Sequence, residues 1–169
     1  HSLYVSYNQL TGSIPPVLGN LPKLQELYMR SNQLTGQIPP ELGRLSNLQR
    51  LYLHSNQLTG PIPPELGNPG GLVELRLDSN QLRGNIPRQL GNLAKLTTLD
   101  IGYNALYAKD ASLKAFLDSK QPGWDLTQTV APTGIKAAAA SKSSLDLSWI
   151  PIAYTGGSGG YRIFQSSSY

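Results

Sequence analysis

Cysteine is absent from the 169 residues of this chain. That absence excludes disulfides, thiolate zinc sites and cysteine nucleophiles together, while it leaves the cellular compartment open. Charge is also sparse, at 14% of residues, and although the formal net charge is +4, no run of four lysines or arginines occurs. Without a basic patch, neither a nucleic acid nor an anionic membrane surface is a predicted partner.

Long apolar runs are missing as well. No stretch approaches the roughly 20 residues that a membrane-spanning helix needs, so no membrane insertion is predicted. The sequence also holds no secretory signal peptide. It begins at His1, inside the repeated pattern described next, and we therefore expect a fragment of a longer protein.

A sequence pattern recurs every 24 residues over about the first hundred positions. Its register is carried by asparagines, at Asn8, Asn32, Asn56, Asn80 and Asn104. A leucine follows each asparagine by two positions, and the first four copies continue with a glycine and an Ile-Pro pair. A period of this length is typical of solenoids, whose coils bury their apolar stripe by stacking on one another.

Each copy predicts a short strand and a turn. The segment Leu51-Tyr52-Leu53 alternates apolar and polar side chains, which is the period of a strand with one buried face. An asparagine amide offers two donors and one acceptor, so stacked asparagines are expected to form a ladder that satisfies buried backbone groups of neighbouring coils. The glycine permits a backbone conformation that a β-carbon opposes, and the Ile-Pro pair then fixes an extended stretch.

The segment from Leu48 to Gly67, LQRLYLHSNQLTGPIPPELG, resembles the plant-type leucine-rich repeat of plant receptor ectodomains and bacterial surface proteins. The similarity covers residues 2–106 and implies an α/β solenoid over residues 1–106, a right-handed superhelix whose parallel strands line a concave face. The resemblance also implies a second small strand near each Gly-x-Ile-Pro and short 3-10 segments on the convex side.

Two departures from the pattern carry expectations of their own. Pro69-Gly70-Gly71 stands where the other copies have a leucine, and this coil is therefore expected to lose a core side chain. Tyr107-Ala108 replaces Thr-Gly after Leu106, so the array is expected to end there.

Residues 107–129 are predicted to form a helical cap, because the last coil of a solenoid needs a cover. Asp110 is suited to cap a helix from Ala111 to about Asp118, whose apolar face would be formed by Leu113, Phe116 and Leu117. Trp124 is expected to pack beneath the cap, since large aromatic side chains are usually buried.

Residues 130–169 change in character. The sequences from Ala131 to Gly134, from Leu145 to Pro151 and from Gly160 to Ile163 resemble strands A to C of a fibronectin type III domain, which implies an incomplete all-β immunoglobulin-like sandwich. Because such a domain needs about seven strands for its two packed sheets, we expect this tail to be poorly ordered.

The resemblance implies that the concave face is a docking surface, so the chain is predicted to be a non-enzymatic protein- or peptide-binding module of a secreted or cell-surface protein. Three tyrosines fall in one column beside two arginines, a composition found at interface hot spots; the alternative is that tyrosine is simply a good strand former. The predicted ligand-binding residues are Tyr4, Tyr28, Arg30, Arg50, Tyr52, His54, Arg76, Asp78, Asp100 and Tyr103.

His54, Asp78 and nearby serines invite an enzymatic interpretation. A nucleophile and base need a shielded site with oriented hydrogen bonds and oxyanion donors, which an open sheet does not supply. We therefore expect a surface contact between His54 and Asp78 without catalysis, and no cofactor or metal site.

Several alternatives stay open at this point. A carbohydrate is an alternative ligand, and the chain could instead be a structural or adhesive spacer, or the targeting arm of a larger receptor or enzyme. The cap sequence is similar to that of bacterial members of the family. The lack of cysteine pairs and of Asn-x-Ser/Thr sites also favours a bacterial over a plant relation.

Overall fold

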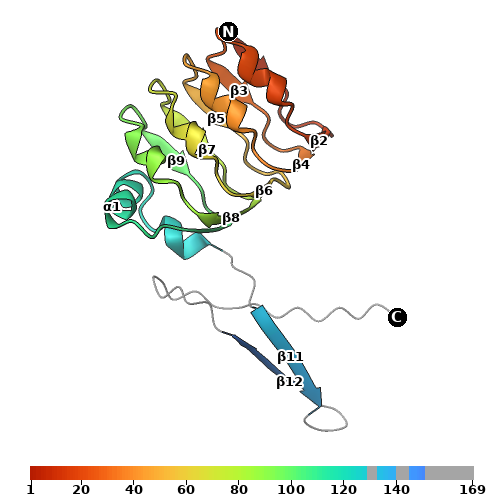
Figure 1. Cartoon of the computed structure of the whole chain (residues 1–169). Coiled ribbons are helices and arrows are strands. Elements are labelled where there is room, and N and C mark those ends of the chain that lie inside the picture. The colour runs from red at the N-terminus through yellow and green to blue at the C-terminus, as the bar shows by residue number, and fades with distance from the viewer. Residues whose placement is uncertain (129–132, 140–144, 151–169) are drawn as a thin grey trace.

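The structure, a computed structural model, describes residues 1–128, 133–139 and 145–150. Residues 1–107 form stacked coils, each of which contributes one strand to a parallel five-stranded sheet with the order β1-β3-β5-β7-β9 (Figure 1). The strands of this sheet are β1 (Ser2–Tyr4), β3 (Glu26–Tyr28), β5 (Arg50–Tyr52), β7 (Glu74–Arg76) and β9 (Thr98–Asp100). The register advances by 24 residues from strand to strand, as Leu27 pairs with Leu51 and Leu51 with Leu75. The predicted parallel sheet is thereby confirmed.

A second set of short strands lies on the opposite side of the asparagine turns. They form a two-stranded sheet of β2 and β4 and a three-stranded sheet with the order β10-β8-β6. Their bounds are β2 (Thr11–Ser13), β4 (Gln33–Thr35), β6 (Thr59–Gly60), β8 (Gln81–Asn85) and β10 (Ala105–Tyr107). These are the second strands that the repeat resemblance implied.

Short 3-10 helices follow each Ile-Pro pair, in agreement with the sequence prediction. They are η1 (Pro16–Asn20), η2 (Pro40–Arg44), η3 (Pro64–Gly67) and η4 (Arg88–Asn92). In each case the preceding proline is extended, and a second proline opens the first three helices. Proline fixes the backbone torsion that a helical first turn requires and has no N–H to leave unpaired, which explains its place there.

The 3-10 helices of adjacent coils approach closely at a recurring glycine. A β-carbon at Gly43 would lie 2.3 Å from the carbonyl oxygen of Glu65 in the next coil, whereas one at Gly91, in η4, would meet nothing within 4 Å. The glycine of the Leu-Gly pair therefore sets how tightly one coil packs on the next.

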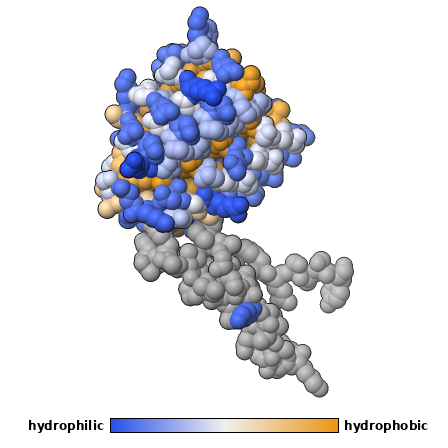
Figure 2. Space-filling model, in the orientation of Figure 1, coloured by the Kyte–Doolittle hydropathy of each residue, from blue (hydrophilic) through white to orange (hydrophobic). Residues whose placement is uncertain are grey.

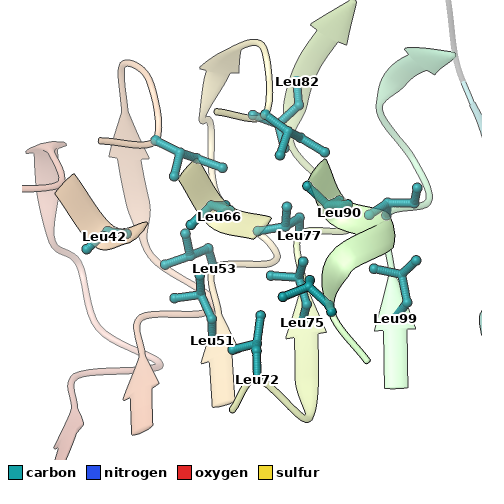
Figure 3. Close-up of a cluster of buried hydrophobic side chains, with 14 of the residues drawn as sticks. Leu42, Leu51, Leu53, Leu66, Leu72, Leu75, Leu77, Leu82, Leu90 and Leu99 are labelled. Atoms are coloured by element: carbon teal, nitrogen blue, oxygen red, sulfur yellow. The ribbon is translucent and has the colours of Figure 1, made fainter. Parts of the chain in front are cut away.

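The core is a continuous column of leucine and isoleucine side chains between the sheet and the 3-10 helices (Figure 3). Leu51, Leu53, Leu75 and Leu77 come from successive coils, and all four are completely buried. Burying a leucine side chain contributes about 1.5–3 kcal/mol before conformational entropy is subtracted. Each coil packs its leucines against the coil before it and the coil after it, so the coils stabilise one another.

The departure at Pro69 has a smaller effect than the sequence suggested. The leucine that other coils place here, such as Leu45 or Leu93, belongs to the core cluster, so this coil lacks a core leucine; Pro69 occupies the position and is itself buried. What changes is the 3-10 helix: η3 ends at Gly67, and Asn68, with its N–H bonded to the carbonyl of Glu65, takes the capping position. Elsewhere a leucine occupies that position, as Leu45 does after η2.

The last coil is covered by helix α1 (Ala111–Lys120) and the 3-10 helix η5 (Trp124–Thr127). Asp110 caps α1 by accepting a hydrogen bond from the N–H of Leu113 at 2.8 Å. Trp124 is completely buried, as predicted, and its indole donates to Asp118 at 3.0 Å. The helix runs two residues beyond the predicted end at Asp118.

Strands β11 (Thr133–Ala139) and β12 (Leu145–Ile150) pair antiparallel. β12 lies within the segment that resembles strand B of a fibronectin type III domain, whereas β11 shares only Thr133 and Gly134 with the segment that resembles strand A. The predicted third strand near Ile163 lies outside the described residues. The prediction that this tail is poorly ordered also concerns mainly residues outside the described part of the chain.

Hydrophilic side chains cover much of the face seen in Figure 2, with apolar residues visible between them. None of the described helices is long and apolar enough to cross a membrane.

Candidate functional site

The concave sheet presents its outward side chains in parallel lanes, one residue from each coil. The sheet register confirms the lane order expected from the sequence, as Tyr4 pairs with Tyr28 and Tyr52 with Arg76. We name three lanes. The Glu–Arg lane contains Ser2, Glu26, Arg50, Glu74 and Thr98; the tyrosine lane contains Tyr4, Tyr28, Tyr52, Arg76 and Asp100; the histidine lane contains Ser6, Arg30, His54, Asp78 and Gly102.

In the Glu–Arg lane, Arg50 lies between two carboxylates. Its guanidinium pairs with Glu26 and, at 2.8 Å, with Glu74. The hydroxyl of Tyr4 donates to Glu26 and that of Tyr52 donates to Glu74. These hydroxyl bonds, reinforced by Arg50, lower the pKa of both glutamates. Arg50 is thus fully paired within the protein, and its two glutamates leave the lane with one net negative charge.

The tyrosine lane is a row of rings in mutual contact. Tyr4 stacks on Tyr28 with centroids 4.8 Å apart, and Tyr28 meets Tyr52 edge to face at 4.5 Å. Burial, with the hydrogen bond to Glu74, raises the pKa of Tyr52 to about 12. Tyr4 is 64% exposed, while Tyr28 and Tyr52 are half-buried. The three rings form a partly exposed aromatic ridge, and the stacked rings of Tyr4 and Tyr28 already cover each other's faces.

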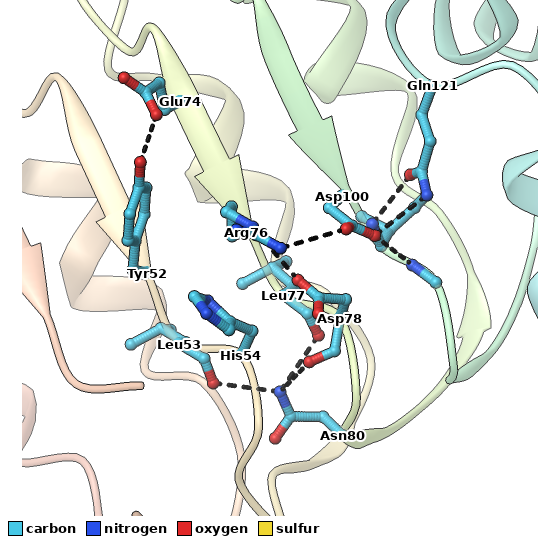
Figure 4. Close-up of polar contacts among 12 residues, drawn as sticks. Tyr52, Leu53, His54, Glu74, Arg76, Leu77, Asp78, Asn80, Asp100 and Gln121 are labelled. Carbon is cyan, nitrogen blue, oxygen red and sulfur yellow. Dashed lines mark hydrogen bonds and ion pairs between the residues drawn. The ribbon is translucent and has the colours of Figure 1, made fainter. Parts of the chain in front are cut away.

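At the capped end of the sheet, Arg76 also holds two carboxylates. It lies 3.5 Å from Asp78 and 3.4 Å from Asp100 (Figure 4). Gln121 of the cap donates to Asp100 at 3.0 Å and accepts from the N–H of Ile101 at 2.9 Å. The cap therefore supplies a polar side chain to the edge of the candidate face, a role that sequence reasoning missed.

The histidine lane departs from expectation. His54 and Asp78 were expected to meet at the surface, but they are only 7% and 8% exposed, and no hydrogen bond joins them. Burial, with the nearby charges of Arg76 and Arg30, lowers the pKa of His54 to about 4, and burial raises the pKa of Asp78. The side chains of Tyr52 and Arg76 in the neighbouring lane lie beside His54 (Figure 4), and the ring centroids of Tyr52 and His54 are 5.7 Å apart. His54 is thus a neutral group at the floor of the face.

Arg30 and Tyr103 occupy different parts of this surface. The Arg30 guanidinium lies 4.9 Å from the centroid of the Tyr7 ring and 5.8 Å from that of Tyr52. Tyr103 is 61% exposed next to the cap. The structure therefore brings Arg30 to the tyrosine ridge but leaves Tyr103 at the other end of the sheet.

The asparagines make the hydrogen bonds that the ladder hypothesis required. Asn56 donates to the carbonyls of Leu53 and Met29 at 3.0 Å each, and it accepts from the N–H of Leu34 at 3.1 Å. Asn32, Asn80 and Asn104 repeat this pattern in their own coils. Asn8 differs, since it is exposed and bonds only carbonyls of its own coil.

The ladder extends one step beyond the predicted set. Gln128 lies 24 residues after Asn104, accepts from the N–H of Leu106 at 3.0 Å and donates to the carbonyl of Ile101 at 3.0 Å. An amide side chain at the next position of the 24-residue period was the signal that could have identified it. The ladder therefore ends within the cap.

The residue before each ladder asparagine takes a left-handed backbone conformation. This column consists of Tyr7, Ser31, Ser55, Ser79 and Tyr103, with φ between 51° and 57°. Such values are uncommon outside glycine and mark a fixed turn. They turn the chain so that the next side chain points into the ladder.

The described residues contain no group of three potential metal-ligating side chains. Among the described contacts, Ser31 of the left-handed column donates its backbone N–H to the carbonyl of His54 at 3.1 Å, and Nδ1 of the His54 imidazole has no hydrogen-bond partner. The arrangement therefore offers a contoured aromatic and polar surface, with its charges largely paired.

Two leucine rich repeat family models match the sequence, at residues 1–58 and 71–93. Among solved structures, the ectodomain of the plant membrane receptor kinase GASSHO1/SCHENGEN3 from Arabidopsis thaliana, in complex with CASPARIAN STRIP INTEGRITY FACTOR 2, is 43% identical with a TM-score of 0.66. The plant peptide hormone receptor RGFR1 in complex with RGF2 is 42% identical with a TM-score of 0.66. A plant ice-binding protein is 34% identical with a TM-score of 0.60.

Each match covers a larger share of this chain than of the other protein's chain. Each receptor match covers 70% of this chain, but only 14% of the first receptor chain and 19% of the second. The ice-binding protein match covers 62% of this chain and 34% of the other. No curated protein matches the sequence. Because the same fold carries peptide receptors and an ice-binding protein, the ligand has to be argued from the site itself.

Proposed function

The chain is a leucine-rich-repeat protein, and we propose that its concave face recognises an extended segment of a peptide or protein. The observation that carries this proposal is the ridge formed by Tyr4, Tyr28 and Tyr52 on an open sheet, flanked by arginines. Aromatic and arginine side chains that cluster on a surface are typical of interface hot spots. Apolar clusters that reach the surface of a soluble protein mark interaction sites, and this ridge is exposed at Tyr4 and partly exposed at Tyr28 and Tyr52.

The dimensions of the face suit such a ligand. Five strands at a spacing of about 4.8 Å present a surface roughly 19 Å across, and an extended chain of about six residues covers that distance. The similarity to the plant peptide hormone receptor RGFR1, solved in complex with RGF2, supports a peptide as the ligand class here.

We further propose that the chain has no enzymatic role. His54 is neutral and buried, and within the described residues Nδ1 of its imidazole has no hydrogen-bond partner. Placement at the cell surface or outside the cell is likewise a proposal, supported by the ectodomain relatives.

Two finer predictions remain. The pairing of β11 with β12 supports the proposal that residues 130–169 begin a fibronectin type III domain, because strands A and B of such a domain are neighbours in one sheet. A relation to bacterial surface proteins rests on the cap sequence and stays a prediction.

The test is a selection of random peptides of about twelve residues, roughly twice the width of the sheet, against the full chain. Selected peptides are then measured against a concave variant, Tyr28→Ala with Tyr52→Ala, and a convex control, Arg44→Ala with Glu65→Ala, whose side chains are outside the sheet. We expect the concave variant to lose binding by about tenfold or more and the control to bind like the parent. A failure to select any peptide, or equal loss in both variants, would contradict the proposal and favour a spacer.

A further inference from the structure

Four buried side-chain atoms in the described part of the chain have no hydrogen-bond partner. They are Oγ of Ser6, Nε of Arg30, Nδ1 of His54 and Oδ1 of Asp78. All four belong to the histidine lane, in which they are the four members with polar side chains. Buried polar groups in proteins are nearly always paired with protein, water or ligand. Their concentration in one lane therefore points to an occupant of that lane.

The lane contains one cation whose charge is not balanced by a neighbour. Arg50 and Arg76 on the same sheet each hold two carboxylates. Arg30 makes no ion pair with any residue that the structure describes; its guanidinium lies instead between the rings of Tyr7 and Tyr52. Aromatic faces attract a guanidinium and hold it in place, but they do not neutralise its charge.

The neighbours of Arg30 along the lane carry no charge that competes for its guanidinium. Ser6 on one side and His54 on the other are uncharged at neutral pH, and both have a free hydrogen-bonding atom. The nearest carboxylate of the lane belongs to Asp78, two coils from Arg30, about 10 Å away at the usual strand spacing. Its Oδ1 forms an ion pair with Nε of Arg76 at 3.5 Å, so its charge is engaged there although the atom accepts no hydrogen bond.

We propose that Arg30, between Ser6 and His54, forms the subsite for a carboxylate on a side chain of the extended peptide ligand. A planar guanidinium binds a carboxylate through two parallel hydrogen bonds, and such charge-assisted bonds are stronger than neutral ones. Ser6 and His54 add hydrogen bonds to the same group or to the adjoining main chain. The inference rests on the proposed peptide-binding function and names the ligand chemistry that the face prefers.

The test uses peptides selected as above, synthesised with blocked termini so that side chains supply every carboxylate. Each aspartate or glutamate is replaced in turn by its amide, and affinities are measured for the parent chain, the variant Arg30→Gln and the matched control Arg44→Gln. We expect one acidic position whose amide form binds the parent about tenfold more weakly, and this difference to vanish in Arg30→Gln. The control is expected to behave like the parent.

The possible results separate this inference from the proposed function. If Arg30→Gln binds as well as the parent while Tyr28→Ala with Tyr52→Ala does not, the subsite is refuted and the peptide-binding function stands. A preference for acidic peptides that persists in Arg30→Gln, or that appears only with a free C-terminus, also refutes the subsite. If no peptide is selected at all, both proposals are refuted. The melting temperature of Arg30→Gln is expected to stay close to that of the parent, because the substitution breaks no ion pair of the described residues and removes only the contacts with the rings of Tyr7 and Tyr52.

Discussion

Replacing Asn56 by alanine is expected to destabilise the solenoid by about 2–5 kcal/mol. The substitution leaves the N–H of Leu34 without its acceptor and removes one hydrogen bond each from the carbonyls of Met29 and Leu53. A buried N–H without a partner costs about 1–3 kcal/mol, and each lost carbonyl bond costs roughly 0.5–1 kcal/mol because a neighbouring ladder amide remains. Since small domains are stable by only about 5–15 kcal/mol in total, the effect is large enough to measure well.

Asn8 provides the matched control for this substitution. It occupies the same position of the repeat, but it is exposed and accepts no hydrogen bond from another coil. Asn8→Ala is therefore expected to cost about 1 kcal/mol or less. Urea unfolding followed by far-UV circular dichroism gives both free energies. Equal losses for the two variants would refute the view that inter-coil hydrogen bonds of the asparagines stabilise the stack.

Three further predictions concern packing, the end of the ladder and pH. Gly43→Ala is expected to lower the melting temperature strongly, because the added β-carbon would lie 2.3 Å from the carbonyl oxygen of Glu65. Gly91→Ala is the control and is expected to leave the melting temperature unchanged, because its β-carbon would meet nothing within 4 Å. Equal shifts of the two variants in a thermal melt would contradict this packing. Gln128→Ala is expected to lower the free energy of unfolding by about 1–3 kcal/mol, since it leaves a backbone N–H of the last coil unpaired. Urea unfolding measures this free energy. An unchanged value would mean that the ladder ends at its last asparagine. The folded chain holds the pKa of His54 at about 4, below its ordinary 6.5, so the unfolded chain binds the proton more tightly. The contribution of neutral His54 to the free energy of unfolding is therefore fully present above pH 6.5 and is lost as the pH falls toward 4. The loss is at most on the order of 3 kcal/mol. The urea midpoint is expected to fall in that range in the parent and to stay flatter in His54→Gln; parallel curves would contradict the assignment.

Much of the fold could be predicted because the repeat is local and strict. The alternation at Leu51, Tyr52 and Leu53 identifies a strand with one buried face, and the 24-residue spacing of asparagines fixes which residues become neighbours. Once coils stack in register, lane membership follows from arithmetic alone. The second strands and 3-10 helices came from the resemblance to a known repeat.

The site was less predictable because exposure on this face depends on neighbouring lanes. Nothing in the sequence around His54 indicates that the side chains of Tyr52 and Arg76 lie close enough to bury it. Gln121 belongs to the cap, which lies outside the 24-residue repeat. The repeat pattern therefore does not predict that Gln121 contacts the sheet. Pro69 shows the converse, since an apolar ring can occupy the position of a leucine and stay buried.

The proposal that the concave face binds the ligand is tested most directly by hydroxyl-radical footprinting of the full chain with and without a selected peptide. Oxidation is expected to fall at Tyr4, Tyr28 and Tyr52, and to stay unchanged at Val17, which is 63% exposed on the convex side. Protection of Val17 with the three tyrosines unaffected would show that the ligand binds elsewhere.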